Sequence, residues 1–227
     1  MDTLSPQVMH KLVFTILVHG LPDTQTTLAF EVLGEAQSHP NPQIRELAVV
    51  ALAELSISPP KRVLALAKAM QDDSARVRRR AARALGDFGM HAIPAIPVLT
   101  AGLRDIDASV RRDSAGTLGR LGVAASSAAP SLVGLLADPD VRTRVVVSTA
   151  LKRIGAAAIP ALLDGLHNPV GEVRARVISL LAHIDPDNER VIDAIRAATH
   201  DADADVRHCA IAVLDQAHVP HATLVGA

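Results

Sequence analysis

Arginine is the residue type in this sequence whose spacing most clearly supports chemistry. Residues 72–89 read DDSARVRRRAARALGDFG and carry five arginines close together. Guanidinium groups bind carboxylates and phosphates through paired, charge-assisted hydrogen bonds. If the stretch is a helix, Val77 and Leu85 fall on one apolar stripe. Three arginines fall on the opposite side: Arg79, Arg80 and Arg83. The pattern therefore indicates a helix with one buried face and one face able to bind anionic groups.

Residues that could support catalysis or metal binding do not form a recognisable motif. The sequence contains no phosphate-cradling glycine loop, no nucleophile elbow and no CxxC pair. Cys209 has no evident base partner, and a small buried apolar role is favoured for it. His218-x-x-His221, and His200 with His208 and Cys209, have spacings that permit metal contacts, but surface or tail histidines are the favoured interpretation. We therefore expect no catalytic site, no metal and no cofactor.

The arginine-rich stretch is one copy of a repeat. Related segments begin at residues 39, 72, 105, 138, 168 and 201, at steps of 33, 33, 33, 30 and 33 residues. One aligned column is arginine in every copy: Arg45, Arg78, Arg111, Arg144, Arg174 and Arg207. Seven residues later a column is leucine: Leu52, Leu85, Leu118, Leu151, Leu181 and Leu214. Two such columns at nearly constant spacing indicate an α-solenoid.

Each copy is expected to be a pair of helices joined by a tight turn. The first helix often opens near proline, whose missing N–H has no helical partner in a first turn. The predicted pairs are 24–37 with 43–55, 59–70 with 74–88, 92–103 with 107–121, 127–136 with 140–154, 157–166 with 171–184, and 188–199 with 203–217. An N-terminal capping helix is expected within residues 1–22 and a flexible tail at 218–227. The prediction is one elongated all-α domain over residues 1–217.

The fourth and fifth copies depart from this pattern. In the fourth copy Val141-Arg142 and Thr143-Arg144 both fit the motif, so its register is ambiguous by two residues. The step into the fifth copy is three residues short, and Asn168 stands where other copies have an acid. We therefore expect a local break in stacking or curvature between residues 138 and 173.

The repeat resembles the HEAT repeat. Its proline-opened helix, aspartate-containing turn and Val-Arg-x-x-Ala-x-x-x-Leu-Gly motif are similar to the short HEAT-like repeats of phycobilisome lyase subunits and many bacterial proteins. The resemblance covers residues 24–217. It implies a right-handed superhelix of about six helical hairpins, with the Val-Arg helices lining its concave side. HEAT-repeat di-iron hydroxylases rely on His-Glu pairs, and no histidine here is followed by glutamate, so that chemistry is not expected.

The resemblance also implies a ladder in which turn aspartates and helix arginines join neighbouring repeats. Carried over, its members are Asp72, Arg78, Asp105, Arg111, Asp138, Arg144, Arg174, Asp201 and Arg207. A turn carboxylate can accept backbone N–H bonds at a helix start, and a hydrogen bond to a charged group contributes about 1.5–3 kcal/mol. The arginine column is therefore expected to be structural rather than functional.

Positions of the Val-Arg helices that point away from the core are candidates for partner binding. The predicted groove has an apolar floor and a basic rim, with Arg79, Arg80 and Arg83 on one flank. The floor is Val145, Val146 and Thr149, and the rim is Arg112, Arg120, Arg153 and Arg176. Such a surface suits an acidic, partly apolar peptide or protein. The alternative is that these arginines form a solvated face and the valines are core residues in a shifted register.

Composition narrows the choice of partner and compartment. Residues 71–153 contain 13 basic and 8 acidic residues, although the whole chain has a net charge of −1. Without Trp or Tyr, and with three Phe, the chain lacks the aromatic platforms that stack bases, so nucleic acid is disfavoured. The lone Cys209 fits a reducing compartment. No apolar run approaches the roughly 20 residues that a membrane span needs, and the apolar patch at residues 12–18 is interpreted as part of the capping helix.

These features predict a cytoplasmic, non-enzymatic scaffold or adaptor. It would bind a partner protein or peptide through the basic-rimmed concave groove. Two alternatives stay open: a bilin lyase or chaperone-like accessory subunit, which rests on the resemblance, and a nucleic-acid-binding HEAT-like protein. The identity of the partner and the oligomeric state are not specified by the sequence.

Overall fold

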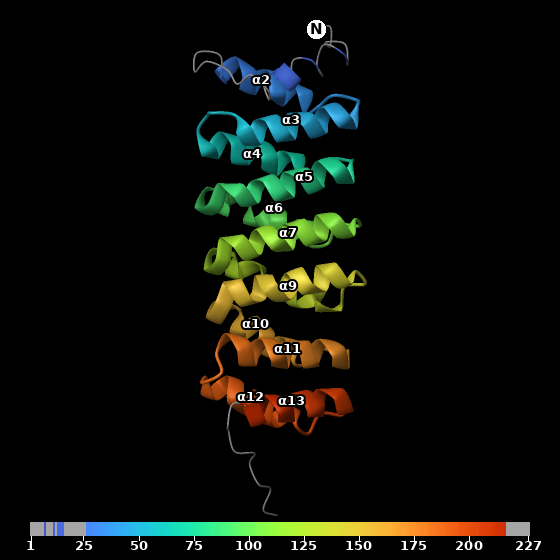
Figure 1. Cartoon of the computed structure of the whole chain (residues 1–227), viewed down its shortest axis with the longest axis vertical. Helices are drawn as coiled ribbons and strands as arrows, with labels where there is room; N and C mark the ends of the chain where they lie inside the picture. Colours follow the sequence, from blue (N-terminus) through green and yellow to red (C-terminus); the bar gives the residue numbers. More distant parts are fainter. Residues whose placement is uncertain (1–6, 8–10, 12, 16–25, 217–227) are drawn as a thin grey trace, which may run out of the picture. The chain divides into compact units, whose positions relative to one another are not determined.

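The structure is a computed structural model that describes residues 7, 11, 13–15 and 26–216. Every regular element in these residues is a helix, which confirms the predicted all-α fold class (Figure 1). The chain forms two compact units, Met1–Leu121 and Gly122–Ala227. Most of the predicted capping helix and the predicted tail at 218–227 lie outside the described residues. The single domain and the right-handed superhelix stay predictions.

Three helical hairpins make up the described part of the first unit. The helices are α2 (Thr26–Ala36), α3 (Pro42–Glu54), α4 (Pro59–Ala69), α5 (Ala75–Leu85), α6 (Ile96–Gly102) and α7 (Ala108–Leu121), with a 3₁₀ segment, η2 (Gly86–Ala95), before α6. The second helices α3, α5 and α7 pack side by side in that order (Figure 1). Their common surface is the face on which the arginine-rich stretch lies.

The second unit also contains three hairpins. Its elements are η3 (Gly122–Ala128), α8 (Ala129–Gly134), η4 (Leu135–Ala137), α9 (Val141–Ile154), η5 (Gly155–Ala158), α10 (Ile159–Gly165), α11 (Gly171–Ile184), α12 (Glu189–Ala198) and α13 (Ala204–Gln216). Helix α11 packs extensively against α13 but much less against α9. The weaker contact lies in the region where the short repeat step predicts a break in stacking.

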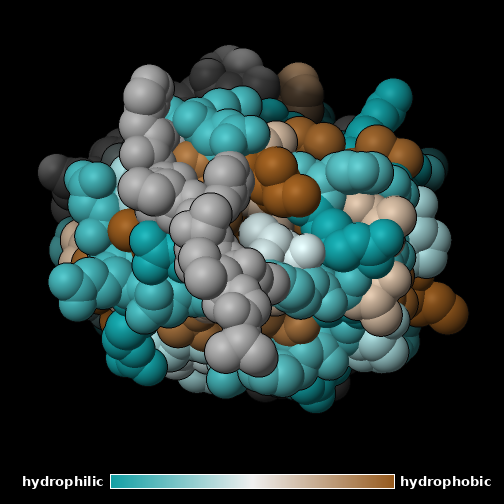
Figure 2. Space-filling view, turned by 90° about the horizontal axis from the view of Figure 1, so that it is seen from below, coloured by the Kyte–Doolittle hydropathy of each residue, from teal (hydrophilic) through white to brown (hydrophobic). Residues whose placement is uncertain are grey.

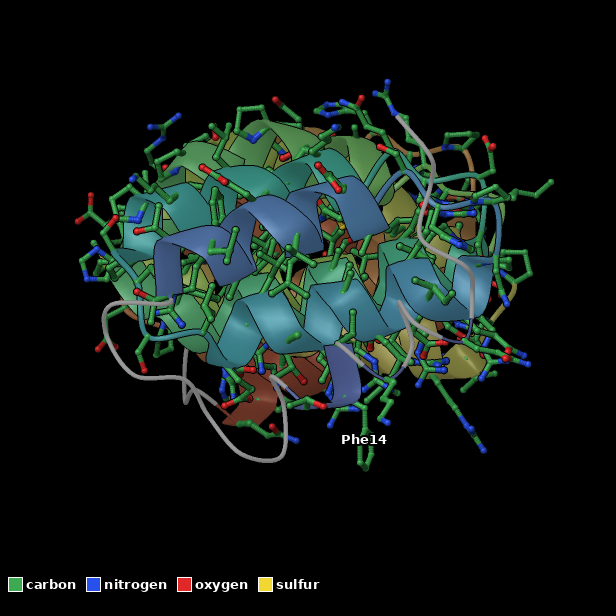
Figure 3. The ribbon with its side chains drawn as sticks, turned by 90° about the horizontal axis from the view of Figure 1, so that it is seen from above. Phe14 is labelled. Atoms are coloured by element: carbon green, nitrogen blue, oxygen red, sulfur yellow. The ribbon has the colours of Figure 1, made fainter. Side chains whose placement is uncertain are left out.

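The repeated leucines form the core of each hairpin. All six are at most 2% exposed. Full burial of a leucine side chain contributes about 1.5–3 kcal/mol, and no single short helix could bury its stripe without a neighbour. The apolar period therefore determines which helix faces point inward. In the N-terminal segment, Val13 is buried and Phe14 is about half exposed, with its ring directed away from the helices (Figure 3).

Several first helices are shorter than predicted. The predicted helix 92–103 is observed as α6, which begins at Ile96 after a 3₁₀ segment. The change has two backbone causes. Gly89 has φ 51°, a conformation that favours glycine and that kinks η2, and Pro97 lies in the first turn of α6, where it fits without losing a hydrogen bond. Three second helices begin and end within one residue of the predicted ranges 107–121, 140–154 and 171–184, whereas α5 ends at Leu85, three residues before the predicted end of the helix 74–88.

Two continuous helical stretches, Ala108–Ala137 and Val141–Gly165, are long and apolar enough to cross a membrane by length and composition alone. This differs from the prediction that no apolar run approaches that length. Each stretch contains a glycine with positive φ, Gly122 at 57° and Gly155 at 72°. A positive φ interrupts the helical backbone, so neither stretch is one uninterrupted α-helix, and length and composition alone are weak evidence for a membrane span.

Candidate functional site

The ladder arginines join adjacent hairpins within each unit. In the first unit, Arg45 Nε and Nη2 donate to Asp72 at 2.7 and 2.8 Å, and Arg78 donates to Asp105 in the same way at 2.6 and 2.7 Å. In the second unit, Arg174 pairs with Asp201 at 2.8 and 2.6 Å. The paired residues are 27 positions apart in each case, so each bond links one repeat to the next.

Backbone groups complete each rung. The Asp72 Oδ1 atom also accepts the N–H of Ser74 at 2.8 Å, and the Nη1 atom of Arg78 donates to the carbonyl oxygens of Asp72 and Asp73. Burial by itself would raise the pKa of Asp72, but the hydrogen bonds from Arg45 and Ser74 and the nearby arginine charges outweigh it and hold that pKa below its ordinary value. The same balance lowers the pKa of Asp105. These groups stabilise the stack, and the ladder arginines use four of their five N–H donors within the protein.

The rung at Arg144 is incomplete. Its Nη1 atom donates to the carbonyl oxygens of Asp138 and Pro139, six and five residues earlier, as at the other ladder arginines. Its Nε atom is buried without a hydrogen-bond partner among the described residues. Asn168 occupies the turn position of the acid, and its Oδ1 atom accepts the N–H of Val170 at 2.9 Å. An amide with its oxygen so engaged offers an N–H rather than a second acceptor, so it cannot replace the carboxylate.

The structure resolves the register of the fourth copy. Arg144 makes the carbonyl contacts of a ladder arginine, whereas Arg142 is exposed. Thr143 and Val147 are fully buried. The Asp140 side chain caps the N-terminus of α9 by accepting the N–H of Thr143 at 3.1 Å. Val141 and Val145 are consequently directed outward, at 58% and 59% exposure.

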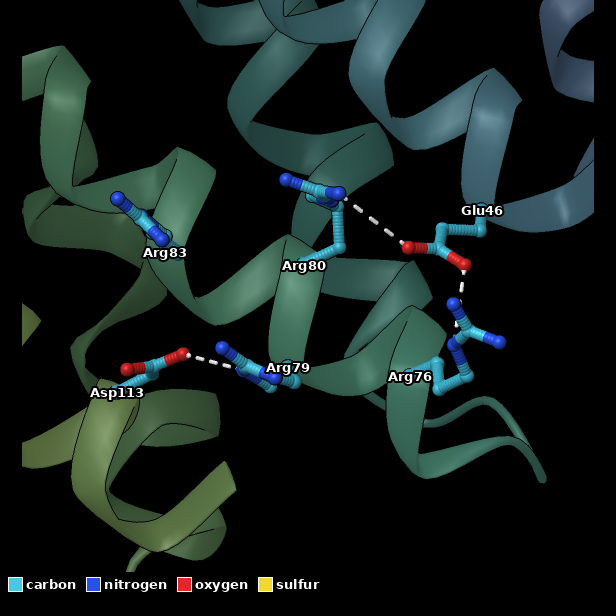
Figure 4. A pocket seen from close by; sticks show the side chains of 6 residues that line it. All are labelled: Glu46, Arg76, Arg79, Arg80, Arg83 and Asp113. Carbon is cyan, nitrogen blue, oxygen red and sulfur yellow. Dashed lines mark hydrogen bonds and ion pairs between the residues drawn. The ribbon is translucent and has the colours of Figure 1, made fainter. Parts of the chain in front are cut away.

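The arginine cluster of α5 surrounds a surface hollow of about 260 Å³ in the first unit (Figure 4). It is lined by Glu46, Arg76, Arg79, Arg80, Arg83 and Asp113. Helix α5 supplies the four arginines, α3 the glutamate and α7 the aspartate. Each of the three helices buries its apolar face and thereby directs its opposite face, with the charged side chains, toward solvent. In α5 the buried face includes Val77 and Leu85. The hollow is therefore built on rigid, packed helices.

Acidic neighbours pair with three of these arginines. Glu46 lies 3.5 Å from Arg76 and 3.4 Å from Arg80, through different carboxylate oxygens, and Asp113 lies 3.2 Å from Arg79. The predicted set of partner-binding residues includes neither acid. The spacing contains the signal, since Arg80 follows Glu46 by 34 residues and Asp113 follows Arg79 by 34, one more than the repeat period.

Arg83 differs from the other arginines of the cluster. Its side chain makes no hydrogen bond or ion pair with the residues that the structure describes, and it is exposed beside the hollow (Figure 4). Four guanidinium groups face two carboxylates, so the lining of the hollow carries two more positive than negative charges. The hollow can therefore accept an anionic group.

The remaining predicted rim residues of the first unit are held by the protein itself. Arg120 Nη2 donates to the carbonyl oxygen of Arg83 at 3.0 Å and to the Thr117 hydroxyl at 3.2 Å. Its guanidinium also occupies the space above Gly86, where a Cβ atom would lie 1.7 Å from Nη2. Arg112 is half-buried and donates to the Ser109 hydroxyl at 3.3 Å. Arg120, which was predicted to bind a partner, thus uses its N–H donors to cap the C-terminal end of α5.

The predicted residues of the second unit lie on α9 and α11. Val145, Thr149 and Arg153 are exposed, whereas Val146 is half-buried. Arg176 is half-buried and pairs with Glu172 on its own helix at 2.5 Å. The predicted groove residues are therefore divided between the two units, and their assignment to a partner stays a prediction.

A larger hollow of about 520 Å³ lies among α11, α12 and α13. Ile192, Ile195, Val213 and Cys209 are part of its lining. Apolar and hydrophilic side chains alternate over the end of the unit formed by α12 and α13 (Figure 2). The Cys209 thiol lies 3.4 Å from the Ser179 hydroxyl and from the Ala175 carbonyl oxygen. No group of three or more His, Cys, Asp or Glu side chains in the described part of the chain is arranged to hold a metal ion, and the pair His218 and His221 lies outside it.

Comparison with known families decides the identity of the repeat. The profile of HEAT repeats matches residues 30–117 and 96–182, which together cover more than half of the chain. The chain belongs to the HEAT-repeat family. The resemblance inferred from the Val-Arg motif is thereby confirmed. No curated protein sequence matches this HEAT-repeat protein significantly.

Solved structures agree with the fold. An engineered protein is similar to this HEAT-repeat protein at 22% identity, with a TM-score of 0.54, over 83% of this chain and 96% of that one. The complex of CpcE and CpcF of phycocyanin lyase from Nostoc sp. PCC7120 is similar at 26% identity, with a TM-score of 0.51, over 82% of this chain and 75% of that one. A second engineered protein is 19% identical, with a TM-score of 0.54, over 92% and 68%. The likeness to the engineered proteins shows the fold alone.

Proposed function

We propose that this HEAT-repeat protein is a non-enzymatic binding module whose α3–α5–α7 face binds an acidic segment of a partner protein. The observation that carries the proposal is Arg83, an exposed guanidinium without a partner in the described residues, beside a hollow lined by three further arginines. Charge complementarity of this kind determines partner choice and association rate. The lone Cys209 is compatible with a reducing cytoplasm as the compartment.

Stability does not account for these arginines. Arg76, Arg79 and Arg80 have side chains 78%, 50% and 46% exposed, and their acidic neighbours lie 3.2–3.5 Å away. Exposed ion pairs of this type contribute about 0–1 kcal/mol each. The half-buried ladder pairs already join the same repeats. The clustered arginines repel one another, and their ion pairs do not offset this cost in folding stability. A role in recognition is therefore favoured for them.

The proposal is tested by reversing charge on the face. The double variant Arg79→Glu with Arg83→Glu, and the control Arg104→Glu, are compared with the parent chain as baits in extracts of the native cell. Arg104 is an exposed arginine of the same unit that does not line the hollow. Quantitative mass spectrometry should show a partner that the double variant loses and the control retains, with equal thermal stability for all three baits. Equal recovery by the double variant and the control would reject the proposal.

A second candidate is an accessory role in a bilin lyase. It is favoured by the 26% identity to the complex of CpcE and CpcF of phycocyanin lyase. In that role the protein should bind a linear tetrapyrrole and change its visible absorption spectrum. A tetrapyrrole spectrum unchanged by excess protein would remove this candidate.

A further inference from the structure

The hollow on α5 has more unused N–H donors than its acidic neighbours can occupy. Arg79 meets Asp113 through Nε, so its two Nη groups remain available. Arg80 meets Glu46 through Nη2, so its Nε and Nη1 groups remain available. Arg83 contributes its whole guanidinium group. Three guanidinium groups around one hollow therefore present donors that no side chain of the described residues accepts from.

The acids hold these arginines in place without covering them. The side chains of Glu46 and Asp113 are 18% and 22% exposed, whereas Arg79 and Arg80 are about half exposed. Figure 4 shows Arg79, Arg80 and Arg83 around the same hollow, with the two acids on opposite sides of it. The carboxylates thus act as positioning groups for the guanidinium ends, which face solvent.

We propose that the hollow binds the phosphate of a phosphorylated serine or threonine in the partner segment. The inference rests on the proposed function and names the group that the face recognises. A phosphate monoester at pH 7 carries a charge of about −1.5 to −2 and three acceptor oxygens. It therefore matches both the two surplus positive charges and the three separate guanidinium groups. A single carboxylate has two oxygens and one charge, and one bidentate arginine satisfies it.

Other sources of phosphate fit the hollow less well. The phosphodiester backbone of a nucleic acid carries one negative charge per phosphate. Proteins that bind it present a row of cationic side chains along the backbone and, for single strands, aromatic side chains on which the bases stack. The cluster here is one compact group on one helix, and the chain has no Trp or Tyr. A phosphorylated side chain places a single group of charge about −1.5 to −2 into a single hollow.

The first experiment uses three labelled peptides of one neutral sequence, with phosphoserine, serine or glutamate at the central position. Fluorescence anisotropy with the full chain at low salt should give at least tenfold tighter binding of the phosphoserine peptide than of the glutamate peptide. Arg83→Gln should lower the affinity for the phosphoserine peptide at least tenfold. The matched control Arg104→Gln should leave binding unchanged, and circular dichroism should give both variants the parent melting temperature.

The second experiment treats the cell extract with a phosphatase before capture by the parent chain. We expect phosphatase treatment to abolish capture of the same partner that the double variant Arg79→Glu with Arg83→Glu fails to capture. If capture survives the phosphatase but not the double variant, the phosphate inference is wrong and the proposed function stands. Equal affinity for the glutamate and phosphoserine peptides, or tighter binding of a single-stranded oligonucleotide than of the phosphoserine peptide, would also overturn the inference.

Discussion

Replacing Asn168 with aspartate should supply the carboxylate that Arg144 lacks. In the complete rungs, the equivalent carboxylate keeps its bond to the backbone two residues later and accepts two guanidinium hydrogen bonds of 2.6–2.8 Å. Asn168 already makes the backbone bond, to Val170. The substitution changes one atom of the side chain, from an amide nitrogen to an oxygen, so it adds an acceptor without adding bulk. Arg144 Nε would then be paired rather than buried and unsatisfied.

The size of the gain follows from the geometry. Hydrogen bonds to charged partners contribute about 1.5–3 kcal/mol each. Desolvation of the new carboxylate offsets part of this, so we expect a net stabilisation of about 1–2 kcal/mol. For a chain of this length, that corresponds to a rise in melting temperature of roughly 3–6 °C. Hydrogen exchange should slow most in α9 and at the start of α11, because the new pair joins α9 to the turn that precedes α11.

Thermal unfolding followed by circular dichroism measures the effect. Asn41→Asp is a matched control, because Asn41 also accepts the N–H two residues later, from Gln43, but serves as the N-cap of α3. Aspartate and asparagine are nearly equivalent N-caps, so the stability of the Asn41→Asp variant should differ little from that of the parent chain. Arg144→Gln should abolish the gain from Asn168→Asp in a double-mutant cycle. A gain that survives Arg144→Gln, or one no larger than that of the control, would refute the incomplete-rung explanation.

Further predictions concern the ladder and the glycines. The lowered pKa values of Asp72 and Asp105 mean that their contribution to stability is fully present above the unfolded pKa of about 3.9 and is lost as the pH falls through the lower folded values. Urea midpoints measured from pH 7 to pH 2 should therefore fall steeply below about pH 4, and Asp105→Asn should reduce that slope. Gly155→Ala should destabilise by about 1–2 kcal/mol because Gly155 has φ 72°. Gly134→Ala should instead stabilise by about 0.5–1 kcal/mol in the same urea assay, since Gly134 is helical and a Cβ atom meets nothing within 4 Å.

Local sequence was sufficient where the answer depends on residue type and spacing. The leucine column identified the buried stripe because each repeat must bury the same face against its neighbours. Asn168 marked the irregular copy because a ladder built from arginine and carboxylate cannot accept an amide in the same position. Both features are visible without coordinates because a repeat places equivalent residues in equivalent surroundings.

The tertiary structure decided the questions that depend on how neighbouring helices are offset. It selected Arg144 over Arg142 as the ladder residue of the fourth copy. It brought Glu46 beside Arg80, 34 residues later, and tied Arg120 to the end of α5. The sequence alone determined the repeat, its period, its buried columns and the surplus of arginine in one copy. Which arginines remain available depends on side-chain contacts across α3, α5 and α7, because a shift of one residue between stacked helices changes every charged pair on their surface.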